Sequence, residues 1–366
     1  MIIKSIELSN YRNYEHLLIE FDHGTNILYG DNAQGKTNIL EAAFQSGTTK
    51  SHRSTKDKEI IRFGCEEGHI KTVVEKNNRE YVIDMHLRAK GSKVVAINKI
   101  PIKKASELLG ILNIVFFSPE DLNIIKNGPA ERRRFIDMEL CQLDKVYLSD
   151  LTNYNKALAQ RNRLLHDISF NPSLMDTLFA WDQKLVEYGK SIIAKRKSFI
   201  EELNEIIGEI HSKISGGKEH LIIRYEPNIE DIFFGDELLK AKQKDLKLMQ
   251  TTVGPHRDDI LFMINDIDIR KFGSQGQQRT SALSLKLSEI NLVERICNNT
   301  PVLLLDDVLS ELDSNRQNYL LNSISDIQTI ITCTGLEEFV KNRFQINKIF
   351  QVINGEVFEK ASPEEI

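Results

Sequence analysis

The sequence lacks any long hydrophobic run. Its longest apolar stretches, such as Ile111–Phe117 and Val302–Leu305, fall far short of the roughly 20 residues that cross a bilayer. Met1–Lys4 leads directly into an alternating strand pattern, so a signal peptide is not expected. We therefore expect a cytoplasmic protein without a membrane partner.

Cysteine is also scarce. The four cysteines, Cys65, Cys141, Cys297 and Cys333, are widely separated and form no CxxC pair. A zinc site or a disulfide framework is therefore not expected, and the pattern is typical of reduced thiols in a cytosolic protein.

Positive charge is not in excess. The net charge of −5 argues against a protein that coats nucleic acid by bulk charge. Two short segments are nevertheless basic, Lys50–Lys56 and Arg132–Arg134. Such runs are more often solvated surface than binding sites, so both readings stay open.

With 366 residues, the chain is long enough for two lobes. Strand patterns occur towards both of its ends and helical patterns lie mostly between them. The expected strands are Ile2–Ser9, Leu17–Phe21, Asn26–Tyr29, Tyr81–Leu87, Val94–Ile97, Ile111–Phe117, Asp259–Ile264, Val302–Leu305, Thr329–Cys333 and Lys348–Ile353. In Trp181–Ile214, apolar residues recur at intervals of three and four, with one interval skipped at Lys195, which predicts one amphipathic helix about 50 Å long. Ser215–Gly217 ends it. The outline is a β-rich lobe, residues 1–128 plus 299–366, interrupted by a largely helical lobe with an arm, residues 129–298.

Residues 30–37 match the pattern GxxxxGK[ST], with a strand expected before them and a helix after them. In this arrangement backbone N–H groups and a helix N-terminus converge on phosphates, glycines permit close approach, Lys36 reaches the β- and γ-phosphates, and Thr37 ligates Mg²⁺. We therefore predict an ATP–Mg²⁺ site whose phosphate loop is formed by Gly30, Asp31, Asn32, Ala33, Gln34, Gly35, Lys36 and Thr37.

An apolar strand followed by two carboxylates, Val302–Asp307, has the form of a Walker B motif. A buried parallel strand would carry Asp306 to the edge beside the phosphate loop, where it would hold Mg²⁺ directly or through water. Asp307 would orient or activate the attacking water. The pattern is weak alone and gains its meaning from the phosphate loop.

A third segment, Phe272–Arg279, precedes an expected helix over Thr280–Glu294 and resembles the signature motif of ABC-type ATPases. Ser310–Asp313 follows the acidic strand in the manner of a D-loop. The order of signature, Walker B and D-loop favours the ABC type over GTPases, whose NKxD motif is missing. The histidine usual in transporter ATPases is absent from Ile331–Gly335, so a contact to the γ-phosphate there would come from a threonine.

With these motifs the chain resembles the RecF family, bacterial recombination mediators in the SMC-like branch of the ABC-type ATPases. The resemblance runs nearly end to end. It is carried by specific strings: Leu8–Tyr14, the phosphate loop, Ser118–Leu122 through Arg132–Asp137, Thr252–Asp259, Ser274–Arg279 and Leu304–Asp313. It implies an α/β fold, an ABC-type ATPase head with mixed β-sheets around the Walker A helix and an inserted, mostly helical second lobe. Gln275, where transporters carry glycine, is the expected variant in this family.

The resemblance further implies ATP-dependent DNA binding, dimerisation on ATP and weak, DNA-dependent hydrolysis that opens the clamp. It implies partners RecR and RecO, action on gapped DNA at junctions of double and single strands, and help in loading RecA. A nucleotide-gated DNA scaffold with negligible turnover is the alternative. A DNA-moving enzyme and a transporter subunit are weaker rivals.

The resemblance also gives roles to single residues. Ser274, Gly276 and Gln277 are expected to contact the nucleotide of a partner chain, and Arg12 to reach the nucleotide from the first strand. Glu120 would be catalytic or a plain helix N-terminal acid. The DNA candidates are His52, Arg53, Lys56, Arg132, Arg133 and Arg134, although the arginines could instead pair with acids such as Glu131 and Asp137. No chemistry assigns a role to His256 or Arg257.

Overall fold

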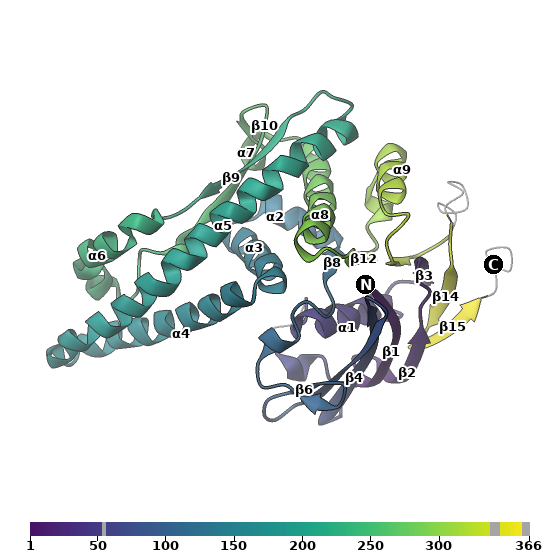
Figure 1. Cartoon of the computed structure of the whole chain (residues 1–366), viewed down its shortest axis with the longest axis horizontal. Coiled ribbons are helices and arrows are strands. Elements are labelled where there is room, and N and C mark those ends of the chain that lie inside the picture. The colour runs from purple at the N-terminus through teal and green to yellow at the C-terminus, as the bar shows by residue number, and fades with distance from the viewer. Residues whose placement is uncertain (53–55, 337–344, 361–366) are drawn as a thin grey trace. The chain divides into compact units, whose positions relative to one another are not determined.

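The computed structural model describes residues 1–52, 56–336 and 345–360 (Figure 1). It divides into two compact units, unit 1 with Met1–Asp121 and Leu285–Ile366, and unit 2 with Leu122–Ser284. The sequence predicts the boundaries between the two lobes after residues 128 and 298, whereas in the structure they follow Asp121 and Ser284. One helix, α8 (Gln275–Cys297), contributes to both units. Within the described residues, no helix is both long and apolar enough to span a bilayer.

Unit 1 contains an antiparallel sheet with the strand order β2-β1-β4-β5-β6-β7. Burial alternates along β4, as expected for a sheet with one face on the core and one in water. The strand β4 is absent from the strands predicted above. The strands are β1 (Ile2–Tyr11), β2 (Tyr14–Glu20), β4 (Glu67–Lys76), β5 (Arg79–Arg88), β6 (Val94–Ile97) and β7 (Ile100–Pro101).

A second sheet of unit 1 is mostly parallel, with the order β15-β14-β3-β13-β12-β8. Every residue of β3, β12 and β13 is buried, which is typical of parallel strands covered on both faces. Only β15 runs antiparallel, to β14. The strands are β3 (Thr25–Tyr29), β8 (Ile114–Phe117), β12 (Val302–Asp306), β13 (Thr329–Cys333), β14 (Lys348–Ile353) and β15 (Glu356–Lys360).

The helix α1 (Lys36–Thr48) packs between the two sheets. It contacts β4 of the antiparallel sheet and β8, β12 and β13 of the parallel one. Ten of its residues are buried, which fits a helix covered on both sides. Besides the second half of α8, the described part of unit 1 also contains the helices η1 (Asp57–Glu59), η2 (Ala105–Glu107), η3 (Pro119–Asp121), η7 (Leu309–Glu311) and α9 (Ser314–Ser323).

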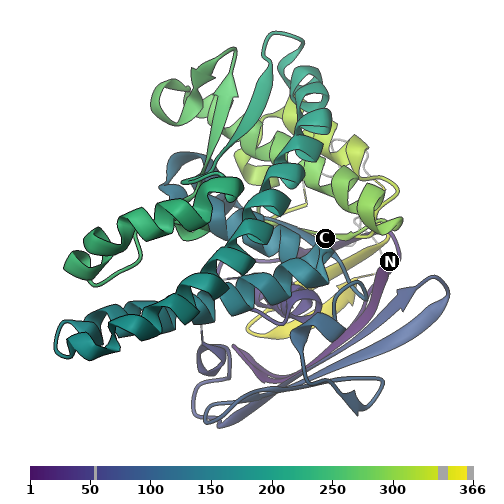
Figure 2. The same ribbon diagram turned by 60° about the vertical axis from the view of Figure 1, so that its left-hand side comes forward.

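Unit 2 is built on the long helix α5 (Leu178–Ser215), which packs along α4 (Lys145–Ile168) (Figures 1 and 2). Gly216, with φ 66°, ends α5 in a left-handed conformation that glycine adopts without strain. The apolar repeat predicted for this helix skips one position at Lys195. The next residue, Arg196, is buried and occupies that place on the buried face of α5. The other helices of unit 2 are α2 (Leu122–Lys126), α3 (Pro129–Leu143), η4 (Pro172–Thr177), η5 (Asp231–Phe233), α6 (Phe234–Leu248), η6 (Pro255–Arg257) and α7 (Ile269–Phe272).

Unit 2 also holds a small antiparallel sheet of order β11-β10-β9, with β9 (Leu221–Glu226), β10 (Asp259–Ile264) and β11 (Ile267–Asp268). The strand β9 packs on α5 and pairs with β10 along its length. The strand β10 coincides with the predicted Asp259–Ile264. The strand β9 is missing from the predictions because its six residues alternate only briefly between two helical patterns.

Candidate nucleotide site

The phosphate loop lies between β3 and α1, at the carboxyl edge of the parallel sheet. Gly30 and Gly35 have φ values of 149° and 114°, in the region that favours glycine. A Cβ on Gly30 would stand 2.4 Å from the carbonyl oxygen of Val352, and one on Gly35 would stand 2.4 Å from Nδ2 of Asn13. The loop therefore has its shape because neighbouring elements approach the glycine backbones closely.

Two hairpin turns brace this loop. From the β1–β2 turn, Asn13 Nδ2 donates to the carbonyl oxygen of Gln34 at 3.0 Å. From the β14–β15 turn, the backbone N–H of Asn354 donates to Oε1 of Gln34. Asn13 also accepts from Nδ2 of Asn38 at 2.8 Å, in the first turn of α1. The sequence prediction does not include these bracing asparagines, because the contacts join segments that are far apart in the chain.

The Lys36 side chain is folded back over the loop. Its Nζ donates to the carbonyl oxygens of Gly30 and Asp31, the latter at 2.8 Å. Burial lowers the pKa of Lys36, and the nearby Asp307 carboxylate opposes that shift. The ammonium group is thus held within the curve of the loop, where Lys36 is predicted to meet the phosphates.

Thr37 and Asp306 are brought together as the sequence predicts for metal ligands. Thr37 Oγ1 donates to Asp306 Oδ1 at 2.8 Å, and Thr332 Oγ1 donates to the same oxygen at 2.8 Å. The strand β13 lies between β3 and β12, so the end of β13 supplies the third group. A hydroxyl and a carboxylate are oxygen ligands of the kind that Mg²⁺ prefers, and the donor set therefore fits this ion.

Asp307 has a positive φ of 53°. Its N–H donates to the carbonyl oxygen and Oγ1 of Thr332, at 3.2 and 3.0 Å, and its carbonyl oxygen accepts from Ser310 Oγ at 2.8 Å. Burial raises the pKa of its carboxyl group, and the Lys36 ammonium partly opposes this. Thr332, of the segment predicted to offer a threonine, thus bonds the carboxylate of Asp306 and the backbone N–H of Asp307.

Glu120 is exposed in η3, which follows β8, the parallel neighbour of β12. This places it three residues beyond Phe117, the last residue of a strand that ends beside the Asp306 strand. Its neighbour Asp121 is buried, accepts from the N–H of Ser118 at 2.7 Å and lies 3.5 Å from Nζ of Lys286. The catalytic role of Glu120 stays a prediction.

Arg12 is held by α1. Its guanidinium makes a two-point contact with the buried carboxylate of Glu41, at 2.7 and 2.8 Å, and donates to the carbonyl oxygen of Glu59 at 2.9 Å. It lines a cavity of about 610 Å³ together with Asn13, Asn38 and the fully exposed Phe63, among others. Sequence reasoning missed Glu41; a single acid among the apolar residues of α1 is the signal that could have found it.

The signature segment lies in unit 2. The prediction for the helix was too short at both ends, because α8 begins at Gln275 and places Gly276 within its first turn. Gln277 N–H donates to Ser274 Oγ at 3.2 Å, and Ser274 N–H donates to Gln277 Oε1 at 2.9 Å. This reciprocal capping box shows that Ser274 is the N-cap of α8.

The basic segment of unit 1 gives a mixed result. The His52 ring packs on the rings of Phe44 and Phe116, with centroids 5.5 and 4.4 Å away. Lys56 is exposed. Arg53 lies outside the described residues. For His52, the geometry therefore supports a packing role, whereas Lys56 remains available for a DNA phosphate.

The three arginines of α3 differ sharply. Arg132 is buried, and its guanidinium binds both carboxylate oxygens of Asp259, at 2.6 and 3.1 Å, and two carbonyl oxygens. The prediction of a DNA contact is wrong for Arg132 in this structure, because its guanidinium is buried and hydrogen-bonded to these partners. Arg133 donates to the carbonyl oxygen of Asp258 at 2.7 Å, and Arg134 is exposed. The alternative of acid pairing applies to Arg132, with Asp259 as the acid.

His256 is an internal residue of unit 2. Its Nδ1 lies 2.8 Å from the hydroxyl oxygen of Tyr154, and its Nε2 lies 3.0 Å from the carbonyl oxygen of Thr251. Burial lowers the pKa of His256 to about 4, so the imidazole is neutral at neutral pH. These contacts give His256 a structural place that the sequence alone could not assign.

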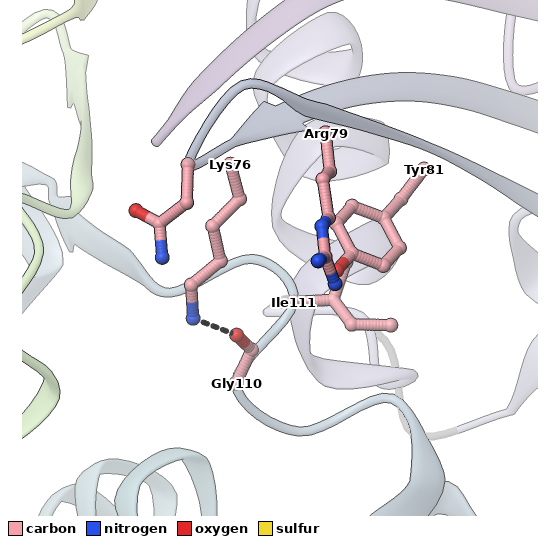
Figure 3. A pocket seen from close by; sticks show the side chains of 6 residues that line it. Lys76, Arg79, Tyr81, Gly110 and Ile111 are labelled. Carbon is pink, nitrogen blue, oxygen red and sulfur yellow. Dashed lines mark hydrogen bonds between the residues drawn. The ribbon is translucent and has the colours of Figure 1, made fainter.

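A further hollow in unit 1, about 320 Å³, lies at the β4–β5 hairpin (Figure 3). Lys76 Nζ donates there to the carbonyl oxygen of Gly110, and Arg79 lies beside Tyr81 and Ile111. Its lining residues belong to none of the nucleotide motifs. The hollow is therefore a feature separate from the phosphate-loop site.

Comparison with known proteins places this geometry in a family. A family model described as the RecF/RecN/SMC N terminal domain matches residues 2–357. The "DNA replication and repair protein RecF" of Agathobacter rectalis is 74% identical over 98% of this chain and 99% of its own length. The protein of the same name from Lachnospira eligens is 63% identical over 98% of this chain and 99% of its own.

Solved structures agree. The recombination mediator protein RecF with bound ATPrS, described as part of the RecFOR pathway, is 37% identical, covers 98% of both chains and has a TM-score of 0.91. An Smc head bound to the C-winged helix domain of ScpA, 17% identical, covers 100% of this chain and 99% of its own with a TM-score of 0.58, and shows the shared ABC-type head fold alone. By its motifs, its sequence relatives and its fold, the chain belongs to the RecF family.

Proposed function

We propose that this chain is an ATP-dependent DNA-binding protein of recombinational repair and replication restart. Support comes from the Thr37–Asp306 contact of 2.8 Å, which joins the end of the phosphate loop to the acidic strand, and from the RecF-ATP structure among its relatives. That relative is a recombination mediator of the RecFOR pathway, which supports RecO and RecR as partners, and RecA loading on gapped DNA as the purpose. We place the protein in the bacterial cytoplasm, associated with the nucleoid.

The phosphate loop would bind ATP through its backbone N–H groups and through Lys36. Thr37 Oγ1 and the Asp306 carboxylate would hold Mg²⁺, directly or through water. Bound ATP–Mg²⁺ supplies the phosphoanhydride bond whose cleavage resets the protein. The cavity lined by Arg12, Asn13, Asn38 and Phe63 adjoins the loop through Asn13 and offers an apolar ring and polar groups for the rest of the nucleotide.

Asp307 would orient the attacking water and accept its proton. Burial raises the pKa of Asp307, which makes its carboxylate a better base than an exposed aspartate. The backbone N–H bonds to Thr332 fix the strained position of Asp307 at the end of β12. Glu120, beyond the neighbouring strand β8, would assist at the same edge of the sheet.

Ser274, Gly276 and Gln277 would complete the nucleotide site of a second chain, because each chain carries the phosphate loop in unit 1 and the signature in unit 2. Two chains would then enclose two ATP molecules around a two-fold axis. ATP would favour the paired state because it makes contacts there that single chains lack. DNA would be held mainly through its phosphates, so binding should weaken steeply with salt.

Light scattering without nucleotide and with ATP–Mg²⁺ tests this proposal. We expect ATP to double the mass of the wild-type chain, Lys36→Ala and Ser274→Arg to prevent doubling, and Asp307→Asn to prolong it. One mass in every nucleotide state would contradict closure by the signature of a partner. A stable doubled mass with negligible phosphate release, unchanged by Asp307→Asn, would favour a DNA scaffold without turnover.

A further inference from the structure

A chain of hydrogen bonds leads from the signature serine into unit 2. Gln277, which shares the capping box with Ser274, donates from Nε2 to Oε1 of Glu219 at 2.9 Å. The other oxygen of Glu219, Oε2, lies 3.1 Å from Nε2 of His211. On the far side of the ring, His211 Nδ1 lies 3.0 Å from Ser284 Oγ. Four side chains thus connect the start of α8 to the last turn of α5.

The contacts around His211 are largely shielded from water. His211 is fully buried, and the Glu219 side chain is 23% exposed. Ser284 Oγ also donates to the carbonyl oxygen of Thr280 at 2.8 Å, so α8 itself holds this end of the chain of contacts. An ionised carboxylate only accepts, so His211 Nε2 donates to Glu219. The His211–Glu219 contact is then charge-assisted, which makes it stronger than a neutral hydrogen bond.

Glu219 is placed by the turn that follows α5. Gly216 and Gly217 have φ values of 66° and 75°, and the chain then enters β9 at Leu221. This turn returns Glu219 to the side of His211, eight residues earlier in the sequence. The position of the Glu219 carboxylate is therefore tied to the end of the long helix.

We propose that Glu219 and His211 are positioning residues that fix the orientation of the Gln277 carboxamide and so keep the signature ready for a partner's nucleotide. The inference rests on the proposed function, because it concerns the signature as a binding element between chains. It deepens that function by linking the arm helix α5 to the signature.

The physical reason lies in the two different ends of a carboxamide. A carboxylate accepts only from the amide nitrogen of Gln277, so Glu219 forces the amide oxygen toward the N–H of Ser274. Without Glu219 the amide can turn over and present N–H to N–H at Ser274. The capping box then opens, and the Ser274 hydroxyl loses the geometry that the N–H of Gln277 gives it.

The test compares Glu219→Ala, His211→Ala and Glu219→Gln with the wild type by light scattering at rising protein concentration, in ATPγS with Mg²⁺. We expect Glu219→Ala to raise the concentration of half-assembly about tenfold, the effect of a lost hydrogen bond to a charged group. His211→Ala should raise it less. Glu219→Gln should stay within about twofold, because its oxygen still accepts from Gln277 and its amide can donate to neutral His211.

Glu209→Ala is the matched control, since Glu209 lies near the end of the same helix in an exposed ion pair with Lys213. Nucleotide binding by single chains and the melting temperature are measured for every variant, because a merely structural role would lower the latter in step with assembly. A double variant adds a further criterion: Glu219→Ala should add nothing once Gln277 is alanine, because both changes break the same connection.

Three outcomes would overturn the inference. If the wild type assembles and Glu219→Ala assembles equally well, the positioning role of Glu219 and His211 is wrong while the proposed function stands. The same holds if the effects of Glu219→Ala and Gln277→Ala add in the double variant. A wild-type chain that stays one size in ATPγS overturns the proposed function together with the positioning role.

Discussion

The phosphate loop of unit 1 and the segment Thr252–Asp259 of unit 2 are both specific sequence strings, but their polar groups are used differently. In the loop, Lys36 lies over backbone carbonyl oxygens, and Asn13, which braces the loop, lines an open cavity together with Arg12. In unit 2, the Asp258 carboxylate accepts from Arg196, from the Tyr225 hydroxyl and from a backbone N–H. In the first region, a ligand can replace the hydrogen-bond partners that Lys36 has now. In the second region, the polar groups are already bonded to partners inside the fold.

The network around Arg196 shows what the second region does. Arg196 of α5 binds the Tyr147 hydroxyl of α4, Asp137 of α3, and Asp258 with the Pro255 carbonyl oxygen of η6 and its C-cap. A specific string can therefore report either a ligand site or the joint between four elements. Burial distinguishes the two, because a buried ion that is fully bonded has nothing left to offer a ligand.

The largest effect should come from Arg196→Ala. Removing the guanidinium leaves Asp258 and Asp137 without their cation in a buried setting, which typically costs about 3–5 kcal/mol. Urea unfolding of wild type and variant measures this. Lys197→Ala, at the exposed next position of α5, is the control and should change stability by less than about 0.5 kcal/mol. Equal stability of both variants would show that the network is dispensable.

Lys36→Ala should lower the affinity for nucleotide and leave the free energy of unfolding nearly unchanged. We expect nucleotide affinity to fall about 100-fold or more, equivalent to roughly 2.7 kcal/mol, because the charge that meets the phosphates is lost. The free energy of unfolding should hardly change, since Lys36 is desolvated and its pKa is lowered in the folded state. Calorimetric titration with ATP–Mg²⁺ and urea unfolding separate the two readouts. Lys50→Ala, an exposed lysine of the same lobe, is the control.

A smaller effect should appear as a pH dependence of stability through His256. Its folded pKa is lowered to about 4, below its unfolded value, so the unfolded chain takes up a proton first as pH falls. The associated stability is present above about pH 6.5 and declines as pH falls toward 4, by roughly 2 kcal/mol between pH 7 and pH 5.

Comparing wild type with His256→Asn isolates this contribution from carboxyl groups that titrate nearby. Asp258 acts in the opposite direction, since burial raises its pKa. The difference in unfolding free energy between the two proteins should shrink as pH falls. A constant difference from pH 7 to pH 5 would mean that His256 is protonated in the folded chain.

The smallest effect concerns DNA. Arg134→Ala should weaken binding of gapped DNA about threefold and lower the slope of log K against log salt by about one, because one exposed phosphate contact is lost. Arg132→Ala should instead destabilise the fold, since the substitution leaves the Asp259 carboxylate without this cation. Fluorescence anisotropy over a salt series, with unfolding curves beside it, tests the contrast. An unchanged salt slope for Arg134→Ala would remove this residue from the DNA surface.

Local patterns predicted much of the fold. The strands Thr329–Cys333 and Lys348–Ile353 have the predicted bounds, because short runs rich in β-branched and apolar residues define them. The end of α5 was predicted at Ile214, one residue before its observed end at Ser215, because two glycines follow. The start of α8 was missed, because a serine followed by three polar residues resembles a loop until the reciprocal Ser274–Gln277 bonds are seen.

The sequence predicted those residues of the site that lie within a local motif, and it did not predict their partners from distant segments. The proximity of Thr37 and Asp306 follows from two motifs at one edge of a parallel sheet. Their shared partner Thr332, and the asparagines that brace the loop, depend on tertiary contacts that no local spacing encodes. Arg132 was misjudged for the same reason, since its partner Asp259 is 127 positions away.

The place of β3 in its sheet has a consequence for how the protein is made. The strand that carries the phosphate loop pairs with β13 on one side and β14 on the other, and both belong to the last part of the chain. During translation, the loop's strand therefore emerges long before either neighbour exists. Its pairing is complete only once Ile353 has left the ribosome. Nucleotide binding thus becomes available only after β13 and β14 have been made, and fragments that stop before β13 should be inert toward ATP.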